Sequence, residues 1–118
     1  MAAKDGVGKY GERVALRHLE DAGFEILARN WRCPEGEIDI VARDREVIVI
    51  CEVKTRSGLG YGLPAEAITR KKADRLRRLA GRWLSEHPAG GADVRFDVVS
   101  VVCAQRGAAV VEHLRAAF

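Results

Sequence analysis

Four polar residues interrupt otherwise apolar segments, and their chemical types suit reactions at phosphate groups. Asp39 and Glu52 lie in two strand-like segments, Lys54 follows Glu52 by two residues, and Glu12 lies in a helix-like segment. Two carboxylates in a partly dry site repel each other unless a cation compensates their charge. Mg²⁺ suits such a pair, because it binds one or two carboxylates together with water and phosphate oxygens. We therefore expect Asp39 and Glu52 to hold Mg²⁺, or Mn²⁺ in its place.

The two acids meet only if their strands form a hairpin in one particular register. Side chains alternate between the faces of a strand, so Glu37 shares a face with Asp39, and Glu52 shares one with Lys54. A two-residue loop at positions 45–46 would put Asp39 opposite Glu52 and Glu37 opposite Lys54. Opposed residues have Cβ atoms about 4.5–5.5 Å apart. The two carboxylates are then neighbours, and Glu37 is either an outer ligand of the cation or only a partner for Lys54.

Glu12 and Lys54 complete the predicted site. Apolar residues recur three, four and seven positions after Glu12, so this acid lies on the apolar stripe of its helix. Alone, Glu12 would be a salt-bridge residue, but beside the other three it is predicted to be a third acid at the same site. The Lys54 ammonium can stabilise charge that develops on a phosphate, or hold an attacking water in its ionised form. The predicted catalytic set is Glu12, Asp39, Glu52 and Lys54.

Hydrophobic periodicity and turn signals predict seven elements that position this set. Helices are predicted at residues 7–22 and 64–86, the second one opening at Pro64. Strands are predicted at residues 24–31, 36–42, 47–53, 96–103 and 108–114. The β-branched run 47–53 is typical of a central strand that is covered on both faces. The order α-β-β-β-α-β-β predicts an α/β protein built around a mixed central sheet.

The composition limits the class of protein further. The chain has 118 residues, 47% of them hydrophobic and 31% charged, which predicts one globular domain over residues 1–118. Its apolar runs fall far short of the ~20 residues that a membrane span needs, and its first residues lack the apolar block of a secretory signal. We therefore expect a cytoplasmic protein with no membrane partner. The cysteines form no Cys-x-x-Cys pair and the histidines no His-x-x-x-His pair, which argues against a zinc site.

A block of positive charge lies between residues 54 and 82. It holds nine lysines and arginines against two acids, whereas the whole chain carries a net charge of +3. Such a block is either a phosphate-binding surface or a solvated helix face. The residues predicted to contact nucleic acid, DNA in the first place, are Arg56, Arg70, Lys71, Lys72, Arg77 and Arg78. Lys72 lies nearest the apolar stripe of its helix, so its stem is expected to pack there while its head group reaches the cleft.

The same residues resemble a known nuclease signature. Asp39, twelve intervening residues and then Glu52-Val53-Lys54 are similar to the Asp…Glu-x-Lys signature of the PD-(D/E)XK nuclease superfamily. Five ordered blocks between residues 8 and about 101 extend the likeness, and on them the chain resembles the bacterial YraN-like, endonuclease-like family. The blocks are Gly11-Glu12, Asn30-Trp31-Arg32, Gly36 to Val41, Glu52 to Arg56 and Arg95 to Val99.

The resemblance implies a fold, an activity and a partner. The fold is a restriction-endonuclease-like three-layer α/β fold, similar to that of archaeal Holliday-junction resolvases, and the analogy with them points to a homodimer. Asp39, Glu52 and Glu12 would be metal ligands and Lys54 the catalytic lysine, while Ile38 stands where the name-giving pattern has proline. The implied activity is Mg²⁺-dependent hydrolysis of phosphodiester bonds in DNA, with branched DNA as one substrate form.

The sequence leaves two other classes of function open. A catalytically inactive nucleic-acid-binding module would keep the basic block but would not cleave its substrate. A protein-interaction scaffold would need neither the basic block nor catalytic activity. Trp31 and Trp83 are expected to be core residues rather than base-stacking platforms. Asp97 is expected to be structural at the start of a strand. The loop at residues 57–62 either follows a nucleic-acid backbone or only joins a strand to a helix.

Overall fold

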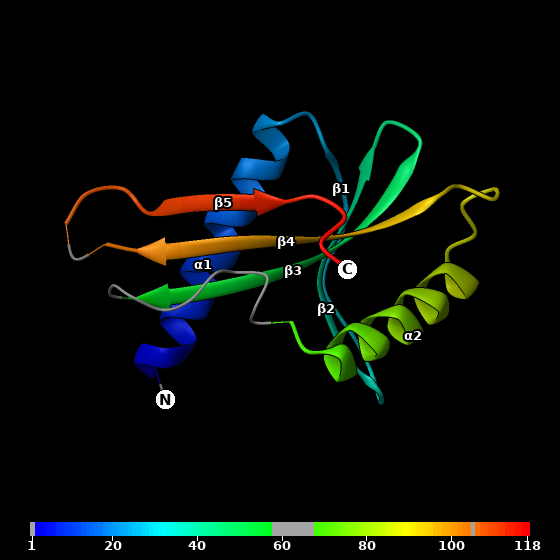
Figure 1. Ribbon diagram of the computed structural model, residues 1–118, viewed down its shortest axis with the longest axis horizontal. Helices are drawn as coiled ribbons and strands as arrows, with labels where there is room; N and C mark the ends of the chain where they lie inside the picture. The colour runs from blue at the N-terminus through cyan, green and yellow to red at the C-terminus, as the bar shows by residue number, and fades with distance from the viewer. Residues whose placement is uncertain (1, 58–67, 105) are drawn as a thin grey trace.

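The protein consists of a five-stranded sheet with one helix on each face (Figure 1). The structure is a computed structural model that describes residues 2–57, 68–104 and 106–118. Its elements are α1 (Ala2–Asp21), β1 (Glu25–Cys33), β2 (Gly36–Asp44), β3 (Val47–Ser57), α2 (Arg70–Glu86), β4 (Val94–Cys103) and β5 (Val110–Leu114). This order confirms the predicted α-β-β-β-α-β-β arrangement.

The sheet is mixed, and β3 lies at its centre. The strand order is β1-β2-β3-β4-β5, with β3 and β4 parallel and the other neighbours antiparallel. A parallel pair needs a crossover connection, and the chain segment that contains α2 makes it. The fully buried residues from Ile48 to Cys51 bear out the prediction of a central strand covered on both faces.

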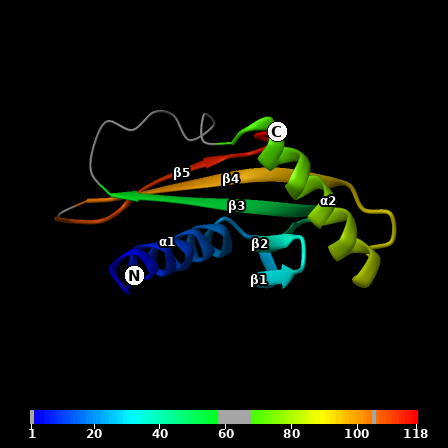
Figure 2. The same cartoon turned by 90° about the horizontal axis from the view of Figure 1, so that it is seen from below.

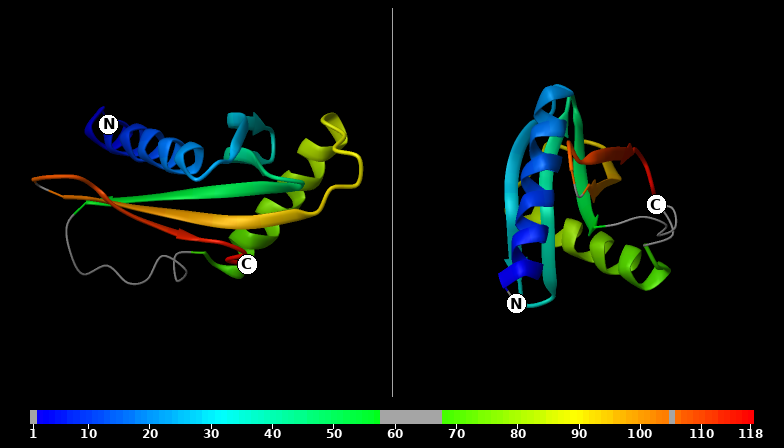
Figure 3. Two further views of the ribbon diagram at one scale, coloured as in Figure 1. Left: turned by 90° about the horizontal axis from the view of Figure 1, so that it is seen from above. Right: turned by 90° about the vertical axis from the view of Figure 1, so that its left-hand side faces the viewer.

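Two apolar clusters join the helices to the sheet and define three layers. On one face, Ala15 and Leu19 of α1 pack with Val49 and Val99. On the other, Leu76, Leu79 and Trp83 of α2 pack with the opposite side chains of β2 and β3, so Trp83 is a core residue as predicted. In Figure 2, α1 runs along one side of β3 and β4 and α2 crosses them near one end, and the right-hand view of Figure 3 shows the two helices on either side of the sheet. Neither helix, within the described residues, is long and apolar enough to cross a membrane.

Helix α2 begins later than the sequence predicted. Thr69 is its N-cap, and the Thr69 hydroxyl accepts a hydrogen bond from the Lys72 backbone N–H at 3.1 Å. A capping threonine satisfies a donor that the first turn leaves unpaired, so the helix starts at Arg70 and Ile68 precedes it. The expected helix opening at Pro64 and most of the 57–62 loop lie outside the described residues.

A buried polar network holds the C-terminal segment against β4. Asp97 has no exposed surface, and its carboxylate accepts hydrogen bonds from Arg95 and from the backbone N–H of Ala116, with His113 Nε2 lying 2.8 Å away. Arg95 also donates to Asp44 at 3.0 Å, which ties the network to the β2–β3 turn. Burial alone would raise the pKa of Asp97, but these partners outweigh it and hold the pKa at about 2. The expected structural role of Asp97 is therefore to hold these partners together through a buried, ionised carboxylate.

The approach of α1 to β3 depends on Gly11. A Cβ atom at Gly11 would overlap the side chain of Thr55, whose Cγ2 would lie only 2.6 Å from it. We expect Gly11→Ala to lower the free energy of unfolding by about 1–3 kcal/mol, the usual cost of overpacking, as measured by urea denaturation.

The matched control for this substitution is Gly8→Ala on the same helix. A Cβ at Gly8 meets nothing within 4 Å, so that change should stabilise the protein by about 0.5–1 kcal/mol through helix propensity alone. A Gly11→Ala variant as stable as Gly8→Ala would show that close packing at Thr55 is not required.

Candidate active site

The candidate site lies where β2 separates from β3. The ladder between these strands starts at the 45–46 turn, in the register that a two-residue loop predicts, and ends at the pair Ile40 and Cys51. Beyond Ile40 the β1–β2 hairpin curls away from β3, β4 and β5 (Figure 1). On β1, Asn30 lies between the partners of Ile40 and Ile38 and has φ of 50° within this curl, a left-handed conformation that asparagine tolerates. The prediction that Asp39 and Glu52 form a ladder pair is therefore wrong, because the ladder ends one step earlier.

The Asp39 side chain replaces a backbone hydrogen-bond acceptor where the β2–β3 ladder ends. Its Oδ2 accepts a hydrogen bond from the backbone N–H of Val53 at 2.9 Å. Once β2 has left the ladder, that N–H has no carbonyl partner on β2, and buried backbone donors are seldom left unpaired. The negative charge of Glu52 acts on the same carboxyl group. The two acids are thus neighbours, as expected, although the strand pairing between them is lost.

Glu52 is buried and is compensated by two lysines. It is 6% exposed, on the face of the sheet that α2 covers. The Lys72 ammonium forms an ion pair with Glu52 Oε2, and Lys54 Nζ lies 3.7 Å from the same oxygen. A buried carboxylate without such partners would cost several kcal/mol. The head group of Lys72 therefore reaches Glu52, in line with its place beside the apolar stripe, while the predicted cleft stays a prediction.

The electrostatics of the site reflect a shortage of positive charge near Asp39. Burial raises the pKa of Asp39 well above its usual value, and the neighbouring Glu52 raises it further. Burial also lowers the pKa of Lys54, and the adjacent Lys72 ammonium acts in the same direction. Asp39 in this arrangement favours its protonated form, whereas a divalent cation at the pair would favour the ionised form. The donor set of two adjacent carboxyl groups thus fits Mg²⁺, which needs one or two.

Glu12 lies near the acid pair but outside it. It is half-buried on α1, the helix that covers the face opposite Lys72, and its charge contributes to the raised pKa of Asp39 after burial and Glu52. Among the residues that the structure describes, no three acidic, histidine or cysteine side chains are close enough to hold one metal ion. The structure therefore brings two of the three predicted acids together, and the role of Glu12 as a ligand stays a prediction.

Glu37 pairs within its own hairpin and not with Lys54, while its alternative as an outer ligand of the cation stays a prediction. Its carboxylate forms an ion pair with Arg32 Nε on β1 at 3.0 Å. Arg32 and Glu37 are ladder partners in the β1–β2 hairpin, which turns away from β3 before reaching Lys54. The predicted cross-strand partnership of Glu37 and Lys54 is wrong for that reason.

The predicted nucleic-acid contacts separate into three environments. Arg70, Lys71 and Arg78 are exposed on α2, and none of them has an ion pair with another described residue. Arg77 is ion-paired with Asp74 at 3.1 Å and also lies over the rings of Phe96 and Phe118. The third environment is half-buried and holds Arg56, near the end of β3, and Lys72, which is ion-paired with Glu52.

One feature of the site and one of the surrounding fold had no signal in the sequence. The Val53 N–H is a backbone donor, so no residue type marks it. The Asp97 network joins Arg95 to Asp44 across 51 positions, and only the folded sheet shows that they meet. The acids and lysines, by contrast, were visible as charges in apolar strands or beside an apolar helix stripe.

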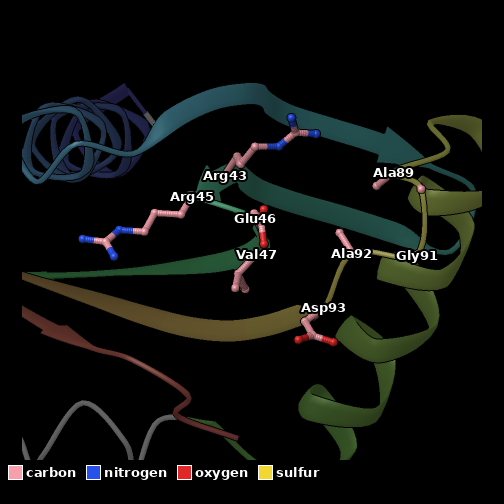
Figure 4. A pocket seen from close by; sticks show the side chains of 9 residues that line it. Arg43, Arg45, Glu46, Val47, Ala89, Gly91, Ala92 and Asp93 are labelled. Carbon is pink, nitrogen blue, oxygen red and sulfur yellow. The ribbon is translucent and has the colours of Figure 1, made fainter.

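A separate pocket of about 490 Å³ lies at the other end of β3. Figure 4 shows Arg43, Arg45 and Asp93 among its lining residues, with the two arginines extending in different directions. No residue of the acid pair lines it. The chemistry described above is therefore confined to the end of the ladder near Asp39.

The fold and the residue set define a class of protein. The chain has a three-layer, restriction-endonuclease-like α/β fold, with an acid pair and a lysine on two strands of its mixed sheet. The model of the family described as "Uncharacterised protein family UPF0102" matches residues 11–101. The chain belongs to this YraN-like family.

Relatives over the full length support this assignment. A UPF0102 protein of Beutenbergia cavernae is 62% identical over 115 residues, covering 98% of each chain. A UPF0102 protein of Frankia casuarinae is 58% identical over 118 residues, covering 100% of each chain. A UPF0102 protein of Acidothermus cellulolyticus is 47% identical, covering 99% of this chain and 96% of its own.

Proposed function

We propose that this protein is a Mg²⁺-dependent nuclease that hydrolyses phosphodiester bonds in DNA. The observation that carries the proposal is the adjacent pair of Asp39 and Glu52, with Lys54 beside it, at the point where the β2–β3 ladder ends. Here two acids are close enough for the charge of one to raise the pKa of the other, and two lysines converge on Glu52. Such clusters of perturbed groups are typical of functional sites.

Each side chain has a distinct task in this proposal. Asp39 and Glu52 would hold the cation, which supplies positive charge to a phosphate and activates water when bound. Lys54 directs an ammonium group to the same place, where it can stabilise the negative charge that develops during hydrolysis. Lys72 compensates Glu52 from the α2 side, and the Val53 N–H fixes the orientation of the Asp39 carboxylate.

The start of α2 favours a polyanionic substrate. Arg70, Lys71 and Lys72 occupy its first turn, which contains no acidic residue. The N-terminus of a helix already carries a partial positive charge, so Arg70 and Lys71, which have no ion pair with another described residue, repel it and each other. A phosphate backbone would relieve this repulsion. The first turn of α2 would therefore bind phosphates of the substrate, next to the acid pair.

A cleavage panel tests this function. The protein is incubated with linear, flapped and four-way DNA and with RNA, each in Mg²⁺, in Mn²⁺ and in EDTA. We expect strand cleavage of DNA with either metal and none in EDTA. Salt-sensitive retention of DNA with no cleavage under any condition would instead identify a catalytically inactive binding module, which the exposed cations of α2 would also serve.

A further inference from the structure

The outer side of α1 carries a groove that the proposed hydrolysis does not use. The groove has a volume of about 690 Å³ and runs between α1 and the edge strand β1. Tyr10 lines it with 39% of its surface exposed, and within the described residues only one other large apolar side chain is as open to solvent. The guanidinium carbon of Arg13 lies 5.9 Å from the centre of the Tyr10 ring. Arg17 and Arg29 line the same groove.

Its charges divide the groove into two parts. Arg13 and Arg17 follow Tyr10 along α1, and Arg29 faces them from β1. Glu20 and Asp21 close the far end, where they would repel an anion. The positive part therefore extends from position 10 to position 17 of the helix, a length of about 10 Å at the usual helical rise.

The elements that form this positive part also hold residues next to the proposed site. Glu12, whose charge acts on Asp39, lies between Tyr10 and Arg13 in the sequence of α1. On the other wall, Arg29 is the ladder partner of Ile40, the residue next to Asp39. The groove and the proposed site are therefore linked through α1 and the β1–β2 ladder.

We propose that the groove binds an unpaired segment of the nucleic-acid substrate, with one base stacked on Tyr10 and its phosphates on Arg13, Arg17 and Arg29. This inference rests on the proposed function and narrows it to substrates that contain a single-stranded region. The bases of a duplex are stacked on each other, so only an unpaired base offers its face to an exposed ring. Arginines beside such a ring hold the backbone and add a cation–π contribution. An acidic peptide would satisfy the arginines but would leave the Tyr10 ring without a planar partner.

The test compares single-stranded and blunt duplex DNA of one sequence, labelled with fluorescein and titrated in EDTA with wild-type protein and variants. We expect Tyr10→Ala to weaken single-strand binding by about 5-fold or more and to leave duplex binding unchanged. Tyr10→Phe keeps the ring and should bind as the wild type does. Val110→Ala is the matched control, because Val110 on β5 is the other exposed large apolar residue of the described chain and lies outside the groove.

The outcomes separate this inference from the proposed function. Equal affinity of the wild type and Tyr10→Ala for single-stranded DNA would overturn the proposal that the groove binds an unpaired segment, whether or not the protein cleaves DNA. Equal competition by a polyglutamate peptide of the same charge would overturn it as well. Tyr10-dependent binding in a protein that cleaves nothing in the metal panel would contradict the proposed hydrolysis and would support the groove.

Discussion

Replacing Lys54 with alanine is expected to abolish cleavage while leaving DNA binding intact. Lys54 Nζ lies 3.7 Å from Glu52 Oε2, and its side chain is 25% exposed, so it is within reach of the acid pair without being locked in the core. Preorganised charge of this kind contributes most when negative charge develops in the transition state. Its removal should lower the single-turnover rate constant by about 10²–10³-fold at saturating protein.

Lys71→Ala is the matched control for this experiment. Lys71 carries the same charge and is exposed in the first turn of α2, one residue from Lys72 but outside the acid pair. This variant should bind DNA more weakly, with a smaller dependence on salt, and cleave at the wild-type rate once bound. Loss of cleavage in both variants to the same extent would mean that total charge, rather than the position of Lys54, supports the reaction.

Replacing Asp97 with asparagine is expected to destabilise the protein strongly. The change leaves the half-buried Arg95 and His113 around a neutral group and weakens the bond to the Ala116 N–H. Removal of one partner from a buried ionic network costs about 3–5 kcal/mol, and we expect the lower end because Arg95 keeps Asp44. Urea denaturation at neutral pH measures the loss.

The pH dependence of unfolding checks the cause of that loss. The pKa of Asp97 is about 2 in the folded protein, below the 3.8 of an unperturbed aspartate, so its stabilising contribution is present above pH 4 and disappears as the pH falls toward 2. The Asp97→Asn variant should therefore lose less stability than the wild type between pH 4 and pH 2. Parallel stability curves for the two proteins would show that ionised Asp97 is not the stabilising species.

The hairpin that carries the acids was predictable because it depends on local information. Two residues between two apolar strands fix the register, and with it the partners of every residue from the turn to Ile40. Beyond Ile40 the path of β2 depends on the curvature of the whole β1–β2 hairpin. This curvature cannot be predicted from any short segment of the sequence. For this reason the proximity of Asp39 and Glu52 was predicted, whereas the Val53 N–H bond and the turning away of Glu37 were not.

The helices show the same division between local and long-range information. The apolar stripe of α2 identified its core residues, and the short distance of Lys72 from that stripe indicated its place in the site. Its start was predicted too early, because proline favours a first turn but Thr69 supplies the actual cap. Glu12 was placed correctly on the inner side of α1, but the sequence could not show that α1 covers the face opposite Lys72.

Binding of Mn²⁺ to the acid pair tests the central claim most directly, and electron paramagnetic resonance follows it because bound Mn²⁺ loses the sharp signal of the free ion. We predict that the wild type binds Mn²⁺, that Mg²⁺ displaces it, and that Asp39→Asn and Glu52→Gln each weaken binding by at least about 10-fold. Glu37→Gln, which removes an acid that is ion-paired with Arg32, should bind as the wild type does. A wild type that binds no Mn²⁺, or an Asp39→Asn variant that binds it equally well, would contradict the assignment of Asp39 and Glu52 as a cation site.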